Sequence, residues 1–195
     1  GTGMIGRLCH IPGYNSLPDD CEIAWLCDIK PEALAKGKEL APGAKTTADY
    51  KDLLNDPEVV AVSVATPNIH HRRHTIDALE AGKHVICEKP LAMNASEAKD
   101  MCRAAKASGK ILQVALQMRF GGGAAFMKRY IDKGHMGEVY YARAQALRRR
   151  GVPHWGVFID KAQQGGGHLI DIGVHILDLT LFLMGYPRPV AASGK

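Results

Sequence analysis

Three polar side chains, distant from one another in the sequence, have the types and spacing of a proton-transfer site. Asp171 and His175 lie four residues apart, which places both side chains on one face of a helix. An aspartate beside a histidine orients the ring and favours its charged form, which suits a general acid or base near neutral pH. Lys89 closely follows a short apolar run, and a lysine at the carboxyl end of a strand can hold a substrate oxygen or help to move a proton. The peptide before Pro90 can be cis, which would fix the direction of Lys89.

A second group of residues indicates where a dinucleotide binds. Gly1, Gly3 and Gly6 fit the G-x-G-x-x-G pattern, whose glycines permit a tight turn, the approach of a pyrophosphate and close helix–strand packing. Asp28 ends an apolar run 22 positions after Gly6, near the spacing of a carboxylate that binds ribose hydroxyls. Such a carboxylate repels the 2′-phosphate of NADP, so we expect NAD, with NADP less favoured, although Lys30 softens this preference. The alternatives are a glycine-rich loop and an aspartate that only caps the following helix.

The elements that must position these residues follow from alternating apolar runs and helix-period segments. Strands are expected at 21–27, 59–65, 84–87 and 111–116. Helices are expected at 31–40, 49–55, 71–81 and from Ser96 to about 108. Apolar strands alternating with helices predict a parallel sheet covered on both faces, so residues 1–120 are expected to form a doubly wound α/β domain of the Rossmann type. Thr66 and Asn68 follow a strand, where they can bind a ligand or cap a helix.

The pattern changes after residue 120, and we expect a second domain over residues 121–195. A helix at 124–133 precedes an alternating stretch, 138–148, which suggests an open antiparallel sheet with one wet face. A further amphipathic helix is expected at 170–184. A glycine turn should follow a strand, and the second sheet has too few strands to close a core. We therefore expect this sequence to be part of a longer protein, with the first Rossmann strand missing.

Composition excludes several classes of protein. Hydrophobic residues make up 46% and charged residues 23% of the 195 residues, which is ordinary for a soluble globular protein. No apolar run reaches the roughly 18 to 20 residues of a membrane span. The five cysteines have no C-x-x-C spacing, which favours free thiols in the cytoplasm. The net charge of +5 comes partly from residues 148–150, without the aromatic interleaving of a nucleic-acid site. We expect no membrane and no nucleic-acid partner.

Taken together, the motifs resemble those of the Gfo/Idh/MocA oxidoreductases, the family of glucose–fructose oxidoreductase and myo-inositol dehydrogenase. They occur in family order over essentially the whole chain. They are the glycine turn, Asp28, T-P-N-x-x-H ending at His71, A-G-K-H-V-x-x-E-K-P from Ala81 to Pro90, and G-G-G-x-L-x-D-x-G-x-H from residue 165 to His175. The last two motifs are the most specific.

The resemblance implies a Rossmann domain followed by an α+β domain with a large, mostly antiparallel open sheet that often mediates a homo-oligomer, here a dimer or tetramer. It implies hydride transfer between a nicotinamide cofactor and a secondary alcohol of a sugar, glycoside or cyclitol. By this analogy His175 removes the hydroxyl proton, Lys89 steadies the oxygen and Asp171 orients the site. The residues expected at the cofactor are Gly1, Gly3, Met4, Ile5, Gly6, Asp28, Thr66, Pro67, Asn68, His71, Glu88, Lys89 and Gln117. Weaker candidates on the substrate side are Arg119, Arg150, His154 and Trp155.

Two other classes of function stay open. A non-catalytic NAD-binding sensor or subunit would keep the glycine turn and Asp28 but would not need Lys89, Asp171 and His175. A metal site could use His168 with Asp171 and His175, or the pair His70 and His74. An exposed ion pair explains Asp171 and His175 without chemistry, although their apolar neighbours argue for a packed helix. We expect no metal.

Overall fold

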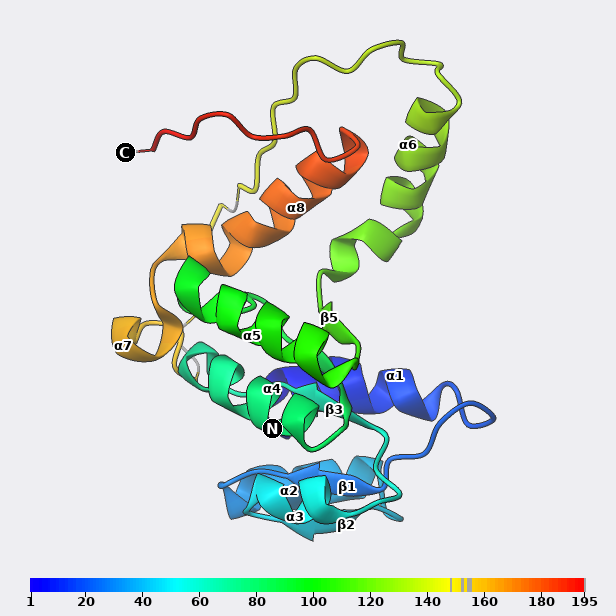
Figure 1. Ribbon diagram of the computed structural model, residues 1–195, viewed down its shortest axis with the longest axis vertical. Helices are drawn as coiled ribbons and strands as arrows, with labels where there is room; N and C mark the ends of the chain where they lie inside the picture. Colours follow the sequence, from blue (N-terminus) through cyan, green and yellow to red (C-terminus); the bar gives the residue numbers. More distant parts are fainter. Residues whose placement is uncertain (148, 152, 154–155, 195) are drawn as a thin grey trace. The chain divides into compact units, whose positions relative to one another are not determined.

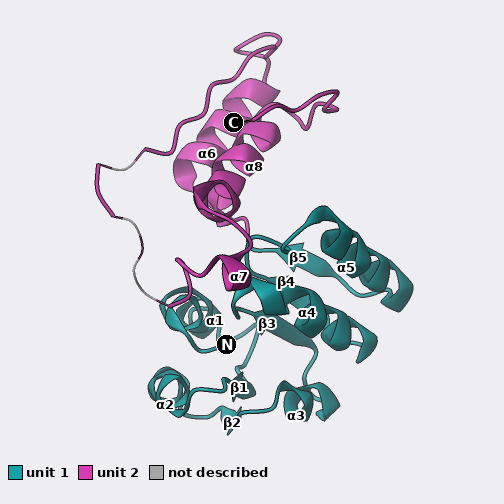
Figure 2. Cartoon of the chain, turned by 90° about the vertical axis from the view of Figure 1, so that its left-hand side faces the viewer, with its two compact units in different colours: residues 1–115 teal, residues 116–195 magenta. Residues whose placement is uncertain are grey.

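The structure is a computed structural model that describes residues 1–147, 149–151, 153 and 156–194. The chain divides into two compact units, Gly1–Ala115 and Leu116–Lys195, which Figure 2 colours separately.

Unit 1 contains two parallel sheets connected through helices. β1 (Trp25–Cys27) pairs with β2 (Lys45–Thr47). β4 (His84–Cys87) lies between β3 (Ala61–Val64) and β5 (Leu112–Val114), as Figure 2 shows. Figure 1 colours the elements in their order along the chain. All three strand pairs are parallel, so their carboxyl ends point to one edge in each sheet. The predicted α/β architecture with parallel strands is therefore confirmed, although β1, β3 and β5 are shorter than the apolar runs that predicted them.

The helices of unit 1 alternate with its strands. They are η1 (Gly6–His10), α1 (Ile11–Asn15), α2 (Pro31–Leu40), α3 (Tyr50–Asn55), η2 (Asn68–His70), α4 (His71–Glu80) and α5 (Ala95–Ser108). Local signals explain their ends. Pro31 occupies the first turn of α2, and the Asp49 carboxylate caps α3 by accepting a hydrogen bond from the Lys51 N–H. Gly82, with φ of 76°, follows α4, and α5 ends at Gly109, with φ of 66°.

The start of α5 corrects one prediction. The expected cap was Ser96, but Asn94 caps the helix by accepting a hydrogen bond of 3.0 Å from the Glu97 N–H. The Glu97 carboxylate in turn accepts a bond of 3.2 Å from the Met93 N–H. This reciprocal arrangement satisfies two N–H groups at the helix start, which a cap at Ser96 would leave unpaired.

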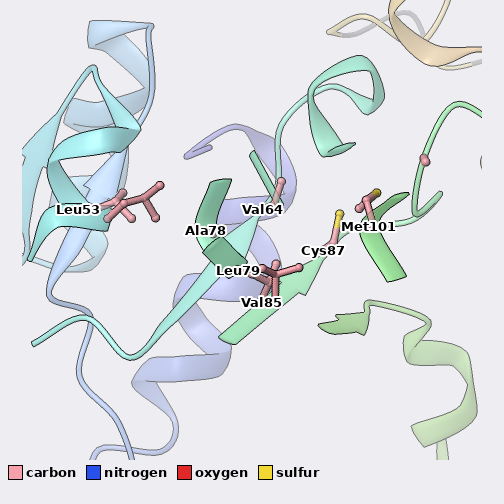
Figure 3. Packing of buried hydrophobic residues seen from close by; sticks show 9 residues of the cluster. Leu53, Val64, Ala78, Leu79, Val85, Cys87 and Met101 are labelled. Carbon is pink, nitrogen blue, oxygen red and sulfur yellow. The ribbon is translucent and has the colours of Figure 1, made fainter. Parts of the chain in front are cut away.

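Two buried clusters hold the strands of unit 1 in place. The larger one, shown in Figure 3, comprises Leu53, Leu54, Val64, Ala78, Leu79, Val85, Cys87, Ala92 and Met101. It joins the sheet of β3 and β4 to α3, α4 and α5, and α4 lies beside α5. The smaller cluster comprises Ile11, Leu26, Ala41 and Ala44. Because every strand except β2 and β5 contributes a residue to one of these clusters, the loops at the carboxyl ends of β1, β3 and β4 start from fixed points.

The regular secondary structure in the described part of unit 2 is all helical. It contains η3 (Gln117–Phe120), α6 (Gly122–Asp132), α7 (Lys161–Gln164), η4 (Leu169–Gly173) and α8 (Val174–Leu183), and α8 packs against α6 and η3. The predicted helices at 124–133 and 170–184 are present. The expected strand at 138–148 is not, since residues 138–147 have no regular secondary structure and no partner strand, and residue 148 lies outside the described part. Alternation alone does not make a strand, because its backbone groups need a neighbouring strand to pair with. The described residues of unit 2 therefore form none of the expected antiparallel sheet.

One stretch of unit 2 has the length and composition of a membrane span. The stretch Lys161–Leu183, 23 residues that include α7, η4 and α8, passes this test of length and composition, and only 6% of its most apolar window is buried. A core helix of a soluble protein can have the same length and apolar composition, so this feature by itself is weak evidence for a membrane span.

Candidate active site

The glycine turn lies where the two sheets of unit 1 meet. A Cβ on Gly1 would lie 2.5 Å from the Ala65 carbonyl oxygen, just after β3, and a Cβ on Gly6 would collide with the Gly1 carbonyl oxygen. Both positions therefore require glycine. By contrast, a Cβ on Gly3 would meet no described atom within 4 Å. The backbone at Gly3 thus faces open space, as the approach of a pyrophosphate requires.

Asp28, one residue beyond β1, is fixed against this turn. Its Oδ2 accepts a hydrogen bond of 2.8 Å from the Thr2 N–H, and its Oδ1 accepts one of 2.9 Å from the Lys30 N–H. The carboxylate therefore both orders the loop before α2 and lies beside the glycine turn. Half-buried and held at both oxygens, it has the position expected of a ribose-binding group.

The segment after β3 contributes buried polar groups at the same edge. Asn68 is 7% exposed, and Thr66 Oγ1 is buried with no hydrogen-bond partner among the described residues. A buried hydroxyl without a partner is costly, so a ligand that supplies a hydrogen bond would be favoured here.

His71 has a different place from the one expected of a cofactor contact. Its side chain is fully buried, with Nδ1 2.8 Å from the Pro90 carbonyl oxygen and Nε2 2.9 Å from the Thr66 carbonyl oxygen. Burial lowers the pKa of His71, and this outweighs the two carbonyl groups, which favour the charged ring. A neutral ring carries one N–H, so His71 donates a hydrogen bond to one of these two carbonyl groups and packs against the other, between the loop after β3 and the loop after β4.

Glu88 and Lys89 follow β4. The Glu88 N–H donates to the Val64 carbonyl, which extends the pairing with β3 by one residue. Glu88 Oε1 lies 3.0 Å from His10 Nε2, and Oε2 accepts a hydrogen bond of 3.1 Å from the Lys89 N–H. Burial raises the pKa of the Glu88 carboxyl, but the contacts with His10 and Lys89 outweigh it, so the pKa lies below its usual value and the group is ionised at neutral pH. The Lys89–Pro90 peptide bond is cis, which the sequence had left open.

Sequence reasoning missed His10 as part of this edge. Its partner Glu88 lies 78 residues away, and no spacing rule connects them. The only signal was its place in the helical turn that follows the glycine pattern.

Asp171 and His175 occupy one continuous helical segment of unit 2. Asp171 lies in η4, a π-helical turn, and His175 lies in α8, where it is 5% exposed. π-Helical turns inside longer helices occur frequently at functional sites. The buried position of the His175 side chain itself argues against an exposed surface ion pair, although the rest of α8 is partly exposed.

Arg119 makes an ion pair within unit 2. Its Nε donates a hydrogen bond of 2.6 Å to Asp178 Oδ2, and a second nitrogen donates to Oδ1. The guanidinium also lies 5.7 Å from the ring centre of Phe182 and 5.4 Å from that of Tyr186. Arg119 thus braces the helix that carries His175, and its contact with a substrate stays a prediction.

The remaining candidates differ in exposure, and Met4, Ile5 and Pro67 are half-buried. Gln117 and Arg150 are exposed, whereas His154 and Trp155 fall outside the described residues. In the described part of the chain no three His, Cys, Asp or Glu side chains are grouped so that they could hold a metal ion. His70 and His74 stack, with ring centres 5.5 Å apart.

A glycine turn between parallel sheets, with a fixed carboxylate after the next strand, defines unit 1 as a Rossmann dinucleotide-binding domain. The chain belongs to the Gfo/Idh/MocA oxidoreductase family. Residues 1–116 match the model described as "Oxidoreductase family, NAD-binding Rossmann fold", and residues 124–195 match that of the GFO/IDH/MocA C-terminal domain. The predicted family is therefore confirmed.

Similar proteins include several named sugar and cyclitol dehydrogenases. D-glucoside 3-dehydrogenase of Escherichia coli (strain K12) is 39% identical, over 96% of this chain and 53% of the relative. The scyllo-inositol 2-dehydrogenase (NADP(+)) IolW of Bacillus subtilis (strain 168) is 31% identical, over 99% of this chain and 52% of the relative. A solved levoglucosan dehydrogenase in complex with NADH and levoglucosan has a TM-score of 0.81 at 30% identity, covering 95% of this chain and 52% of that one. The chain thus spans about half the length of the curated relatives it matches.

Proposed function

We propose that this protein is an NAD-dependent dehydrogenase that oxidises a secondary alcohol of a sugar, glycoside or cyclitol. The observation that carries the proposal is the edge of unit 1, where the glycine turn is bonded to Asp28 and where Asp28 and the Glu88–Lys89–Pro90 segment each follow a parallel strand. Ligands of such sheets gather at this edge. The names of the relatives support the substrate class, since they include a glucoside, a levoglucosan and an inositol dehydrogenase.

The residues present fit a dinucleotide. The open space at Gly3 leaves room for the pyrophosphate, Asp28 can accept hydrogen bonds from ribose hydroxyls, and the buried Thr66 Oγ1 lies at the same edge. When bound there, NAD supplies the carbon that accepts a hydride. Because Asp28 is held at both oxygens, it cannot easily swing away from a 2′-phosphate, which favours NAD over NADP.

The family resemblance supplies the roles of the reacting side chains. The Lys89 ammonium donates a hydrogen bond to the substrate oxygen, and an imidazole nitrogen of His175 takes the hydroxyl proton. As the O–H bond breaks, its electron pair forms the carbonyl, and the C–H hydrogen leaves with its own electron pair to the nicotinamide. Asp171 orients His175 and stabilises the ring when it carries the proton. Arg119, through Asp178, steadies the helix on which His175 lies.

Binding of NADH and NADPH to the full-length protein tests the cofactor half of the proposal. Trp25 is a suitable fluorescence reporter, because it lies on β1 and its Nε1–H donates to Asp56 at 2.8 Å. We expect wild type to bind NADH more tightly than NADPH, and Asp28→Ala to weaken NADH binding on the order of tenfold or more. Asp19→Ala, which removes an exposed carboxylate before β1, is the matched control. A folded protein that binds neither dinucleotide would overturn the proposal.

Turnover separates the enzyme from a sensor. Wild type should reduce NAD with at least one sugar, glycoside or cyclitol, whereas Lys89→Ala and His175→Ala should bind NADH but lose most turnover. Binding without turnover across a broad panel of these alcohols would instead favour the non-catalytic NAD-binding protein. The homo-oligomer, the cytoplasmic location and the absence of membrane and nucleic-acid partners stay predictions.

A further inference from the structure

The helical turn after the glycine motif contacts the loop that carries Lys89. His10, the last residue of η1, points its Nε2 at Glu88 Oε1 with a separation of 3.0 Å. Both side chains are largely buried, at 12% and 14% exposure, so water competes weakly for this contact. A hydrogen bond to an ionised carboxylate is roughly twice as strong as one between neutral groups.

Glu88 passes this restraint to Lys89. While Oε1 faces His10, Oε2 accepts the hydrogen bond of 3.1 Å from the backbone N–H of Lys89. The carboxylate is therefore held from both sides, and its position sets the path of the backbone at Lys89. One oxygen alone would leave the carboxylate free to rotate about its terminal bond.

A second histidine acts on the other side of the lysine. The Pro90 carbonyl lies 2.8 Å from Nδ1 of the buried His71, so the residue after Lys89 packs directly against this buried ring. Lys89 thus lies between two restraints from different helical segments, η1 and α4. The restraint from η1 comes from a segment that begins at Gly6, which also belongs to the glycine turn. The contact of His10 therefore connects the glycine turn to the lysine loop.

We propose that His10 is a positioning residue for Lys89, and that it couples the dinucleotide turn to the lysine loop through Glu88. The role of Lys89 in this inference rests on the proposed function. Small displacements matter at such a site, since a misplacement of about 1 Å can reduce a rate on the order of 100-fold. His10 itself does not exchange a proton with the substrate.

Two substitutions that differ mainly in reach test the contact directly. The side-chain nitrogen of His10→Gln can occupy the place of Nε2, whereas that of His10→Asn is too short to reach Glu88. The readout is the hydrogen-exchange rate of the Lys89 amide, measured by NMR on the full-length protein, because this N–H donates to Glu88. We expect His10→Asn to speed this exchange on the order of tenfold relative to the Val85 amide, and His10→Gln to stay within about threefold of wild type.

General loss of stability is controlled by Leu53→Ala, a core substitution in α3 that does not touch this contact. Leu53→Ala should increase the hydrogen-exchange rates of the Lys89 and Val85 amides by similar factors. If His10→Asn does not fold, Glu88→Gln removes the charge of the same contact and should speed the Lys89 amide selectively. The positioning role would be overturned if the exchange rate of the Lys89 amide, relative to that of the Val85 amide, stays within about twofold of wild type in either folded variant.

Kinetics then relate the contact to catalysis. We expect His10→Asn to lower kcat at least about tenfold with the NADH dissociation constant within about threefold of wild type, and His10→Gln to recover most of kcat. Equal kcat values for His10→Asn and wild type would overturn the inference. The exchange readout needs no turnover, so a wild type that oxidises no alcohol would overturn the proposed function without obscuring whether His10 restrains Lys89.

Discussion

The backbone N–H of Thr2 donates a hydrogen bond of 2.8 Å to the carboxylate of Asp28, which joins the glycine turn to the end of β1. Thr2 is 3% exposed, so this bond is shielded from water. One carboxylate therefore orders the turn and presents negative charge where a ribose would bind.

The charge of Asp28 should control the choice between NAD and NADP. Asp28→Asn keeps the shape and one acceptor oxygen but removes the charge that repels a 2′-phosphate. We expect the ratio of the NADPH to the NADH dissociation constant to fall on the order of tenfold, measured by fluorescence titration. An unchanged ratio would show that Asp28 does not select the cofactor.

The Arg119–Asp178 pair should stabilise unit 2. The two side chains are 28% and 12% exposed, so the pair is only partly screened by water. Arg119→Met should lower the free energy of unfolding by about 1 to 3 kcal/mol, because it leaves a half-buried carboxylate without its partner. Arg119→Lys keeps the charge but loses the two-point contact, so its free energy of unfolding should lie between those of Arg119→Met and wild type. In a double-mutant cycle with Asp178→Asn, strictly additive effects would contradict a direct coupling.

Acid should destabilise unit 1 through the half-buried His74. Burial lowers the pKa of His74 to about 4, from an ordinary value of 6.5. Between these values the unfolded chain binds more protons than the folded chain, so the free energy of unfolding should fall as the pH falls from about 6.5 to about 4. His74→Phe keeps an aromatic ring against Tyr50, whose ring centre lies 4.4 Å away, but cannot take up a proton.

This variant should therefore show a smaller fall in stability over that pH range, as measured by denaturant unfolding at several pH values. Equal slopes for wild type and His74→Phe would rule out His74 as the source.

The cysteines should differ sharply in reactivity. Burial raises the pKa of the Cys87 thiol to about 12, whereas Cys9 and Cys102 are exposed. Because the thiolate is the reactive form, iodoacetamide at pH 8 should modify Cys9 and Cys102 in the native protein and Cys87 only after unfolding. Mass spectrometry of peptides labelled before and after denaturation gives the result directly. Rapid native labelling of Cys87 would contradict its burial in the core.

Much of unit 1 could be predicted because its signals are local. Pro31, Asp49 and Gly82 act within one helical turn, and the helices they delimit match the prediction closely. The glycine pattern and Asp28 have fixed spacing because a strand, a turn and a helix of ordinary length separate them. The family motifs were recognisable for the same reason.

Other features depended on contacts that no local signal specifies. The alternating residues 138–147 have strand-like side chains, but pairing decides whether a strand forms. Asn94 displaced the predicted cap at Ser96 because Glu97 completes its hydrogen bonding.

The sequence by itself determined the family and the order of the elements in unit 1, and it supplied the side chains that we propose to react. Only the tertiary structure decided which residues support them. His10 meets Glu88 across 78 residues, and Arg119 meets Asp178 across 59. Such pairs form only when packed helices and strands bring their side chains within hydrogen-bond distance, because the strength of a polar contact depends on separation and burial rather than on distance along the chain.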